Sequence, residues 1–301
     1  MNTLTLHPAA KVNLSLRVMG RRSNGFHNVE TILHTVGIRD TVQLTAREAG
    51  IELRVTGEQV PADASNLCWR AAELLAAQMK VTRGAGIVLH KGIPVGAGLG
   101  GASSDAAAVL TGLARLWEVA PGPETMDRLA AEIGSDVPFF LRGGCCLALG
   151  RGERLERLPP AALSLVVVAP ERRMPTAQAY AALRRGASLA PRKSLSRATQ
   201  RMLQAVKSGG AAGIAKALHN DFEALEMVGI AEALEAKAAL LEAGCLGALL
   251  SGSGSAVFGL APDARAAESI AEQMRARWGW VTPVPTVTAE ESVVVEEQSP
   301  C

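Results

Sequence analysis

The chain has 301 residues, of which 48% are hydrophobic and 20% are charged, so it can bury a substantial core as one large or two medium domains. Its net charge is +2, its basic residues form no run longer than a pair and its aromatic content is only 3%, so no nucleic-acid partner is expected. No stretch resembles a signal peptide or a membrane span, and the five cysteines form no C-x-x-C pair, so we expect a cytoplasmic protein without a membrane partner.

Short strands are expected at the start of the chain, where apolar and polar residues alternate. Residues 3–7 alternate, Pro8 is expected to break the strand, and residues 11–18 alternate again. Lys11 and Asn13 fall on the polar face of the second run, which by itself usually means a solvated face. A hairpin turn is expected at 21–28, and further strands at 29–37, 41–45, 51–55, 86–90, 145–149 and 153–158. The first half should therefore begin as a mostly antiparallel sheet.

Helices are expected where apolar residues recur with the spacing of one helix face. In the first half these runs cover residues 65–79, 102–117 and 123–133. Asp136 follows the third run and is expected in a short turn before an apolar strand. In the second half we expect helices at 175–185, 194–207, 213–226, 230–243 and 262–277, with strands at 163–169 and 280–284 and a strand–turn–strand at 247–260.

The adjacent prolines Pro159 and Pro160 mark the best domain boundary. We expect a first domain at 1–160, a second at 161–287 and a weakly ordered tail at 288–301. Strands mixed with helices in both halves predict the α+β class.

A glycine-rich stretch at 92–105 precedes the second helix and organises the chain. It holds five glycines within ten residues, followed by Ser103, Ser104 and Asp105. Glycine lets a backbone approach a ligand closely, and the start of a helix presents N–H groups and the positive end of a dipole. The stretch therefore predicts a phosphate-binding loop, although a flexible loop capped by serine is the simpler alternative.

Two common phosphate loops do not fit this stretch. A Walker loop would need a lysine after the glycines, and none follows. The dinucleotide pattern G-x-G-x-x-G matches Gly96, Gly98 and Gly101, but it also requires an acidic residue at the end of a second parallel strand. Glu118 lies near the right distance but falls at the end of the same helix, so the context excludes that interpretation.

Three separated stretches resemble the signatures of the GHMP small-molecule kinases, a family that includes galactokinase, homoserine kinase and mevalonate kinase. In chain order they are residues 8–13, 94–107 and 249–258. The resemblance implies two domains, an N-terminal one like ribosomal protein S5 domain 2 and a ferredoxin-like α+β C-terminal one. It also implies that the glycine-rich loop wraps the phosphates of ATP and that Mg²⁺ is required.

Further residues are similar to one branch of this family, at 21–34, 65–67 and 134–141. That branch acts in the non-mevalonate route to isoprenoid precursors, where ATP phosphorylates the C2 hydroxyl of 4-diphosphocytidyl-2-C-methyl-D-erythritol. The chain departs from its pattern at Asn24, usually aspartate, and at Phe26, usually tyrosine. The alternatives are another GHMP kinase, acting on mevalonate, homoserine or a sugar, and a nucleotide-binding regulatory protein without turnover.

Asp136 is the candidate general base. Phosphoryl transfer to an alcohol requires an acceptor for the hydroxyl proton, and a positioned carboxylate can serve. On residue type alone a cap is the commoner role, whereas the resemblance implies the catalytic one. It also makes Lys11 the partner, whose ammonium would keep the carboxylate ionised and stabilise charge on the attacking oxygen. Asn13 would hold this pair or the substrate hydroxyls.

The ATP site implied by the resemblance combines an adenine contact from Asn66 with the loop itself. Capping is the alternative role for Asn66 and for the two serines, and capping can coexist with phosphate binding. The role of Asp105 is open, because its carboxylate would repel a triphosphate unless a cation intervened. The expected loop contacts are Pro94, Gly96, Gly98, Leu99, Gly100, Gly101, Ala102, Ser103 and Ser104.

The cytosine of the acceptor should be read by stacking and by hydrogen bonds to the base edge. The resemblance places Phe26 and His27 at these contacts, with Tyr180 as a second stacking ring, although core packing is nearly as good an interpretation for the tyrosine. The loop 252–255 should frame the acceptor's diphosphate or brace the central loop. No metal ligand is assigned, and we expect a monomer or a weak homodimer that binds a small-molecule cytidylyl substrate.

Overall fold

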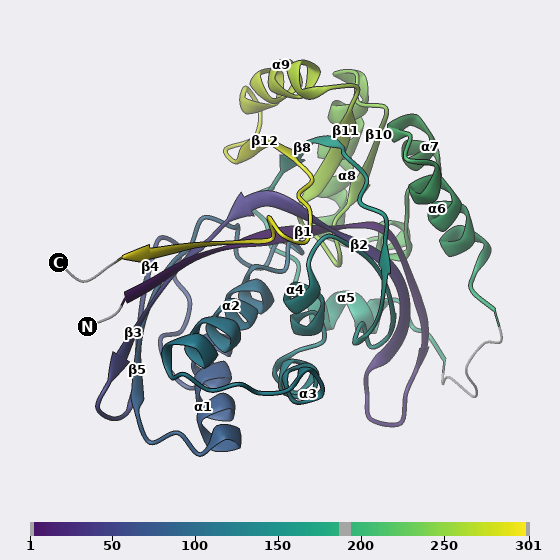
Figure 1. Cartoon of the computed structure of the whole chain (residues 1–301). Helices are drawn as coiled ribbons and strands as arrows, with labels where there is room; N and C mark the ends of the chain where they lie inside the picture. Colours follow the sequence, from purple (N-terminus) through teal and green to yellow (C-terminus); the bar gives the residue numbers. More distant parts are fainter. Residues whose placement is uncertain (1–2, 187–193, 299–301) are drawn as a thin grey trace.

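The computed structural model describes residues 3–186 and 194–298, and its first half is built on one large, mostly antiparallel sheet. Four helices of the first half cover one side of this sheet, and most of the second half of the chain lies on the other (Figure 1). Across the sheet the strands are β4 (Ile51–Thr56), β5 (Gly84–His90), β3 (Thr41–Arg47), β1 (Thr3–Arg21), β2 (His27–Arg39), β6 (Cys145–Gly150) and β7 (Arg154–Leu158).

Strand β1 is the spine of the sheet and runs unbroken through Pro8. The expected break is wrong because a proline removes only its own N–H from the ladder. Its carbonyl still accepts a hydrogen bond from the backbone N of Asp40 (3.2 Å), and a bulge between Ala9 and Ala10 absorbs the irregularity. Lys11 and Asn13 are only 3% and 4% exposed, so the polar face of this strand is not solvated.

The helices of the first half are α1 (Leu67–Met79), α2 (Gly101–Leu116), α3 (Pro123–Ile133) and α4 (Val137–Arg142). The first three match the sequence expectation closely. Alanines at 106–108 let α2 approach the sheet, and Trp117 at its end donates to the carbonyl of Gly84 (3.2 Å). Asp136, expected in a turn before a strand, instead precedes α4, whose early Pro138 favours a helix start.

The second half forms a four-stranded antiparallel sheet with helices. Its strand order is β10 (Gly247–Leu250), β11 (Val257–Ala261), β8 (Ser164–Val168) and β12 (Val281–Pro285). The helices are α5 (Thr176–Ala182), α6 (Arg197–Ser208), α7 (Ala211–Ala217), α8 (Val228–Glu242) and α9 (Ala264–Arg275). The mixture of sheets and helices in both halves confirms the α+β class.

The single helix expected at 213–226 is wrong. Helix α7 ends at Ala217 and is followed by the short strand β9 (His219–Asn220), which pairs with β1, and by the 3-10 turn η1 (Asp221–Ala224). Asn220 explains the change, because its side chain accepts from the backbone N of Phe222 (3.0 Å) and donates to the carbonyl of Gly252 (2.8 Å). Such local side-chain bonds compete with helix formation.

The end of the chain also differs from the expectation of a weakly ordered tail. Strand β13 (Val293–Gln298) pairs antiparallel with β1 over Thr3–Pro8. Ser292, just before it, accepts a backbone hydrogen bond from Ala9 (2.9 Å) through its carbonyl oxygen. The tail is therefore part of the large sheet up to residue 298, and residues 299–301 lie outside the described part.

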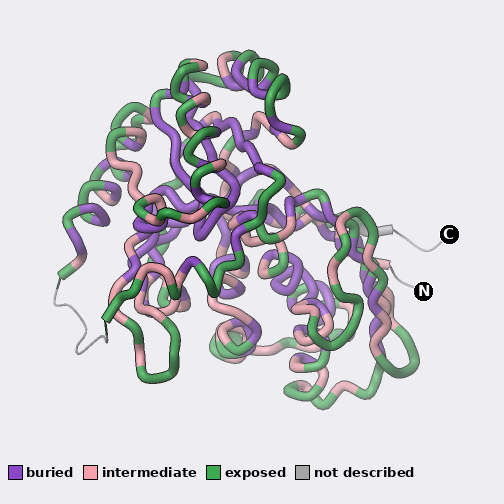
Figure 2. Tube along the Cα trace, turned by 180° about the vertical axis from the view of Figure 1, so that it is seen from behind, coloured by how far each residue is buried: buried purple, intermediate pink, exposed green. Residues whose placement is uncertain are grey.

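The two sheets share a core. Val12 and Leu14 of the first sheet belong to the same buried apolar cluster as Leu165 and Phe258 of the second. Figure 2 shows this zone as the buried centre of the molecule. The chain crosses between the sheets at 159–163, after β7, so the boundary at 160 stays a prediction that the topology supports.

Within the residues 3–186 and 194–298, no helix combines the length and the apolar character needed to cross a membrane. The four cysteines of this part are free and buried, at positions 68, 145, 146 and 245. Burial raises the pKa of Cys145 to about 12, with the neighbouring Cys146 adding to the effect. Such thiols are unreactive.

Candidate active site

The glycine-rich loop lines a cavity of about 410 Å³ between the two halves of the chain. Gly98 and Gly100 have positive φ values of 81° and 77°, which favour glycine. A side chain on Gly98 would collide with the carbonyl oxygen of Ser251, and one on Gly100 would press on the ring of Phe140. The loop is thus packed tightly from behind, so that its open side faces the cavity and leads into the start of α2.

Both ends of the loop are held by one buried charge cluster. The ammonium of Lys91 donates to the carboxylates of Asp40 and of Asp105, the latter at 2.7 Å. Asp40 also accepts from the backbone N of Gly92 (2.6 Å) and of Ile93 (2.8 Å). Burial opposes the charge on Lys91, but the two carboxylates outweigh it and raise its pKa. The carboxylate of Asp105, which lines the cavity, is therefore paired with a buried cation.

Lys11 and Asp136 face each other at the floor of the cavity. The Nζ of Lys11 lies 4.0 Å from an oxygen of Asp136 and donates to Asn13 (2.6 Å) and to the carbonyl of Gly98 (2.7 Å). Burial lowers the pKa of Lys11, and the charge of Asp136 opposes this effect. Asp136 is 38% exposed at its side chain, so its carboxylate is open to the cavity. The structure brings together the three residues that the sequence placed in one group.

The structure separates the two serines at the start of α2. Ser103 lines the cavity, whereas Ser104 is 1% exposed and donates its hydroxyl to the carbonyl of Ala9 (2.7 Å). Ser104 is not among the described residues that line the cavity, so the expected phosphate contact of its side chain is not supported. Its hydroxyl instead fixes α2 to β1.

Asn66 caps α1 and also lines the cavity. Its Oδ1 accepts from the backbone N of Cys68 (2.9 Å), and its Nδ2 donates to the carbonyl of Pro61 (2.7 Å). The capping role is therefore present. Its position at the cavity wall leaves the adenine contact as a proposal.

A second cavity, of about 870 Å³, contains the three aromatic residues expected to bind cytosine. Phe26 in the hairpin is 48% exposed, and the guanidinium of Arg151 lies 4.9 Å from the centre of its ring. The rings of His27 and Tyr180 are 5.3 Å apart, and Tyr180 also packs edge-on against Phe222. Tyr180 thus packs against the core and also lines the cavity, and its role as a stacking ring stays a prediction.

The two cavities meet at the candidate base. Five residues line both of them, namely Ser103, Asp136, Arg151, Thr176 and Tyr180. A nucleotide on the glycine-rich loop and an acceptor beside Phe26 would therefore approach each other at Asp136. This is the arrangement that direct transfer of a phosphoryl group between two bound molecules requires.

The loop 251–255 braces the glycine-rich loop from the second half. Ser251 donates to the carbonyl of Gly98 (3.0 Å), and the backbone N of Ala256 donates to Ala97 (2.9 Å). Gly252 and Ser253 line the first cavity, and Ser253 shares a hydrogen bond with Thr176 (3.0 Å). Of the two expected roles, these contacts favour bracing.

Sequence reasoning missed Asp40, Lys91, Arg151 and Thr176. Lys91 directly precedes the loop, and Asp40 is a lone acid between two apolar runs, so the sequence near each residue could have marked it as a candidate site residue. Their pairing depends on β3 lying beside β5, which spacing alone does not reveal. Among the described residues, no cluster of three or more His, Cys, Asp or Glu side chains could hold a metal ion.

Comparison with known proteins gives one consistent result. Residues 66–144 match the GHMP kinases N terminal domain, and residues 181–279 match the GHMP kinases C terminal family. A 4-diphosphocytidyl-2-C-methyl-D-erythritol kinase of Pelotomaculum thermopropionicum is 45% identical over 274 residues, covering 90% of this chain and 94% of that protein. One of Gloeobacter violaceus is 41% identical over 90% of this chain and 89% of its own length.

Solved structures agree with the sequence matches. A crystal structure of 4-(cytidine 5'-diphospho)-2C-methyl-D-erythritol kinase superposes with a TM-score of 0.75 at 35% identity, covering 94% of this chain and 98% of that one. A homoserine kinase from Cytophaga hutchinsonii reaches a TM-score of 0.74 at only 20% identity, covering 98% of both chains. The second likeness shows the fold alone.

Proposed function

This chain belongs to the GHMP kinase family, and from that premise we propose that it phosphorylates the C2 hydroxyl of 4-diphosphocytidyl-2-C-methyl-D-erythritol with ATP, in the non-mevalonate route to isoprenoid precursors. The observation that carries the proposal is the meeting of two cavities at Asp136, one on the glycine-rich loop and one beside an aromatic hairpin. Relatives named 4-diphosphocytidyl-2-C-methyl-D-erythritol kinase match this chain at, for example, 45% and 34% identity. A homoserine kinase and a mevalonate kinase of similar fold match it at only 20% and 17%.

In the proposed reaction, the oxygen of the acceptor's C2 hydroxyl bonds to the γ-phosphorus of ATP, and Asp136 accepts the proton of that hydroxyl. The bond from that phosphorus to the bridging oxygen breaks, and ADP leaves. Lys11, 4.0 Å from Asp136, stabilises negative charge on the attacking oxygen. The N–H groups of the glycine-rich loop and of the start of α2 hold the phosphates.

Mg²⁺ fits the residues present at the site. It binds proteins through few ligands and usually keeps waters and substrate phosphates, so the absence of a described acidic cluster does not conflict with it. We propose that the Ser103 hydroxyl, which lines both cavities, would hold it together with the phosphates of ATP. When bound, the ion would neutralise charge on the transferring group.

The remaining assignments are also proposals. Asn66 and the loop residues from Pro94 to Ser103 bind ATP, while Phe26, His27 and Tyr180 bind the cytosine. The four free, buried cysteines support a cytoplasmic location. We also expect a monomer or a weak homodimer that binds a small-molecule cytidylyl substrate.

A coupled assay of ADP release tests the function. The purified chain should release ADP from MgATP with 4-diphosphocytidyl-2-C-methyl-D-erythritol, and phosphorus NMR should show a new phosphomonoester on the acceptor. Mevalonate and homoserine serve as controls and should give only background release. Turnover with mevalonate or homoserine but not with the cytidylyl acceptor would show that the proposed substrate is wrong. Binding of ATP without turnover on any acceptor would favour a regulatory protein.

A further inference from the structure

The second cavity carries more positive charge than the recognition of a neutral base requires. Its described lining includes four arginines and a single carboxylate, that of Asp136. A guanidinium has a planar fork of donors that matches the oxygens of a phosphate. A cavity with this charge is suited to an anionic ligand. The four arginines are Arg21, Arg151, Arg184 and Arg185.

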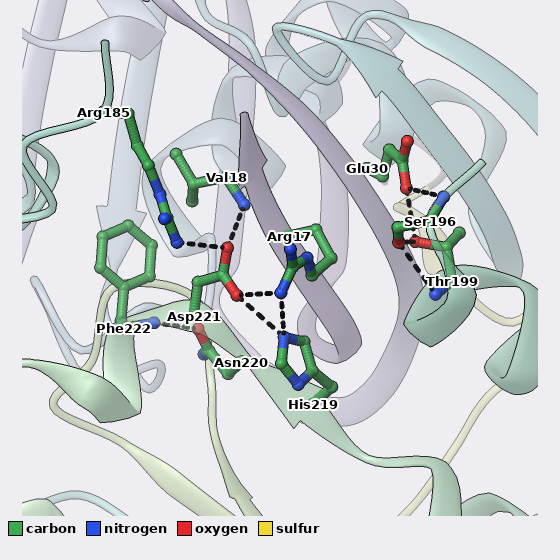
Figure 3. Close-up of polar contacts among 10 residues, drawn as sticks. All are labelled: Arg17, Val18, Glu30, Arg185, Ser196, Thr199, His219, Asn220, Asp221 and Phe222. Carbon is green, nitrogen blue, oxygen red and sulfur yellow. Dashed lines mark hydrogen bonds and ion pairs between the residues drawn. The ribbon is translucent and has the colours of Figure 1, made fainter. Parts of the chain in front are cut away.

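One of these arginines is held by a buried carboxylate. Asp221, at the start of η1, is 5% exposed and accepts from the guanidinium of Arg185 (3.0 Å). Figure 3 shows the same carboxylate accepting from Arg17 (3.0 Å), from the backbone N of Val18 (2.9 Å) and from His219 (2.8 Å). Asp221 therefore ties Arg185 to strand β1, the strand that also carries Lys11.

The charges of this cluster do not cancel. The guanidiniums of Arg17 and Arg185 share the single carboxylate of Asp221, which leaves one positive charge over. The side chain of Arg185 is 39% exposed and lines the second cavity, so the excess positive charge of this cluster is accessible to a ligand there. The positive charge also affects His27 on the opposite hairpin. Burial lowers the pKa of His27, and the charges of Arg21 and Arg185 lower it further.

The other candidate for binding a diphosphate faces elsewhere. Gly252 and Ser253 line the first cavity, where they brace the glycine-rich loop, and they are not among the described residues that line the second. We propose that Arg185 binds the diphosphate of the acceptor and that Asp221 is the positioning residue that holds its guanidinium in place. The inference rests on the proposed function, since it assigns the anionic part of that substrate to a residue.

Steady-state kinetics of Arg185→Gln form the first test. The KM for the cytidylyl acceptor should rise about tenfold to a hundredfold, the scale of a charge-assisted hydrogen bond, while the KM for ATP stays unchanged. Arg277→Gln is the matched control, because that arginine pairs with Glu235 at an exposed site and lines neither cavity. An acceptor KM equal to that of the wild type would overturn the assignment of Arg185.

Direct binding separates this inference from the proposed function. Calorimetry with ADP saturating the first cavity should show that the wild type binds CDP more tightly than cytidine, and that Arg185→Gln loses most of this difference. The result does not depend on turnover. If the wild type fails to phosphorylate the acceptor, the proposed function fails, and CDP binding still decides the role of Arg185. A full CDP preference in Arg185→Gln would contradict the inference.

Asp221 is tested by a split between KM and kcat. Asp221→Asn should raise the acceptor KM with kcat nearly unchanged, and Asp221→Glu should raise it less. When either change is combined with Arg185→Gln, the acceptor KM should rise no further than in Arg185→Gln alone. The control is Glu30→Gln, since Glu30 is similarly buried and accepts from Ser196 N (2.9 Å) and Thr199 Oγ1 (2.8 Å) but lines neither cavity (Figure 3). Glu30→Gln should change the stability of the fold and leave the acceptor KM unchanged. A wild-type acceptor KM in folded Asp221→Asn would refute the positioning role.

Discussion

The ammonium of Lys11 lies 4.0 Å from the carboxylate of Asp136, and the two come from the middle of β1 and from the residue before α4. Lys11 is almost fully buried, and its remaining hydrogen bonds go to Asn13 and to the carbonyl of Gly98. Burial lowers the pKa of Lys11, and the charge of the Asp136 carboxylate opposes this effect.

Asp136→Asn should lower turnover by at least about a hundredfold, the usual scale for a general base, with ATP affinity nearly unchanged. The amide keeps the shape of the side chain but cannot accept the proton. Rapid-quench turnover and calorimetry with ATP measure the two effects. Asp127→Asn is the control, because Asp127 is a partly exposed acid of α3 that pairs with Arg142. Near-wild-type turnover of Asp136→Asn would remove this residue from the mechanism.

Lys91→Met should destabilise the fold by about 3–5 kcal/mol, because it leaves the buried carboxylates of Asp40 and Asp105 facing each other without a counter-charge. Urea unfolding at neutral pH measures the loss. Adding Asp105→Leu should recover part of it, since one of the two charges is then gone. Arg275→Gln removes an exposed pair with Glu272 and should cost under about 1 kcal/mol. A similarly small cost for Lys91→Met would contradict the proposed cluster.

The grouping of Lys11, Asp136 and the glycine-rich loop was predictable from the sequence, but the charge cluster beneath the loop was not. Lys11, Asp136 and the glycines lie inside three signatures whose order along the chain is specific, and the structure brings them together. Lys91 and Asp40 meet only because β3 pairs with β5. That pairing is a long-range contact, which local periodicity does not encode.

Errors in secondary structure had local physical causes. The helix expected across 213–226 fails where the side chain of Asn220 replaces backbone bonds. The tail expected to be weakly ordered contains Val293–Val295, a β-branched run that finds the free edge of β1. Ser104 fits a phosphate-binding pattern by position, yet its hydroxyl is used by the carbonyl of Ala9. In each case one specific partner decided the outcome.

The stability of the wild type should fall as the pH drops below about 6.5, in part because of His34. Its Nε2 accepts from the backbone N of Ala161 (3.2 Å), and burial lowers its pKa to about 4 despite its backbone hydrogen bonds. The unfolded chain then binds more protons than the folded one between about pH 4 and 6.5, so stability is lost on acidification. We expect a loss of about 2 kcal/mol from this residue between about pH 7 and 5.

Urea unfolding of wild type and His34→Gln at several pH values checks this. The variant should be less stable at neutral pH but should lose less stability on acidification, because glutamine does not titrate. The comparison of slopes isolates His34 from the other histidines. Parallel stability curves for the two proteins would exclude a contribution from His34.

Phe26→Ala should weaken acceptor binding by about 1–3 kcal/mol, the range for stacking of a base on an aromatic ring, with ATP affinity unaffected. Phe26 is half exposed in the hairpin, so its loss removes a binding surface more than it disturbs a core. Phe26→Tyr is the matched control and should bind as the wild type does, because the ring face survives. If Phe26→Ala bound the acceptor normally, cytosine recognition would have to come from the region around Tyr180.

His27→Ala should instead reduce selectivity between bases. The ring of His27 lies 5.3 Å from that of Tyr180 in the second cavity, and its nitrogens are polar groups that could read a base edge. A site built around such a group rejects the wrong base because the group is left unpaired. Calorimetry with CDP and UDP, with ADP saturating the first cavity, should show the cytidine preference of the wild type falling in the variant. A variant that keeps the full preference would place base discrimination on other residues of the cavity, and equal affinity of the wild type for CDP and UDP would mean that this cavity does not read the base.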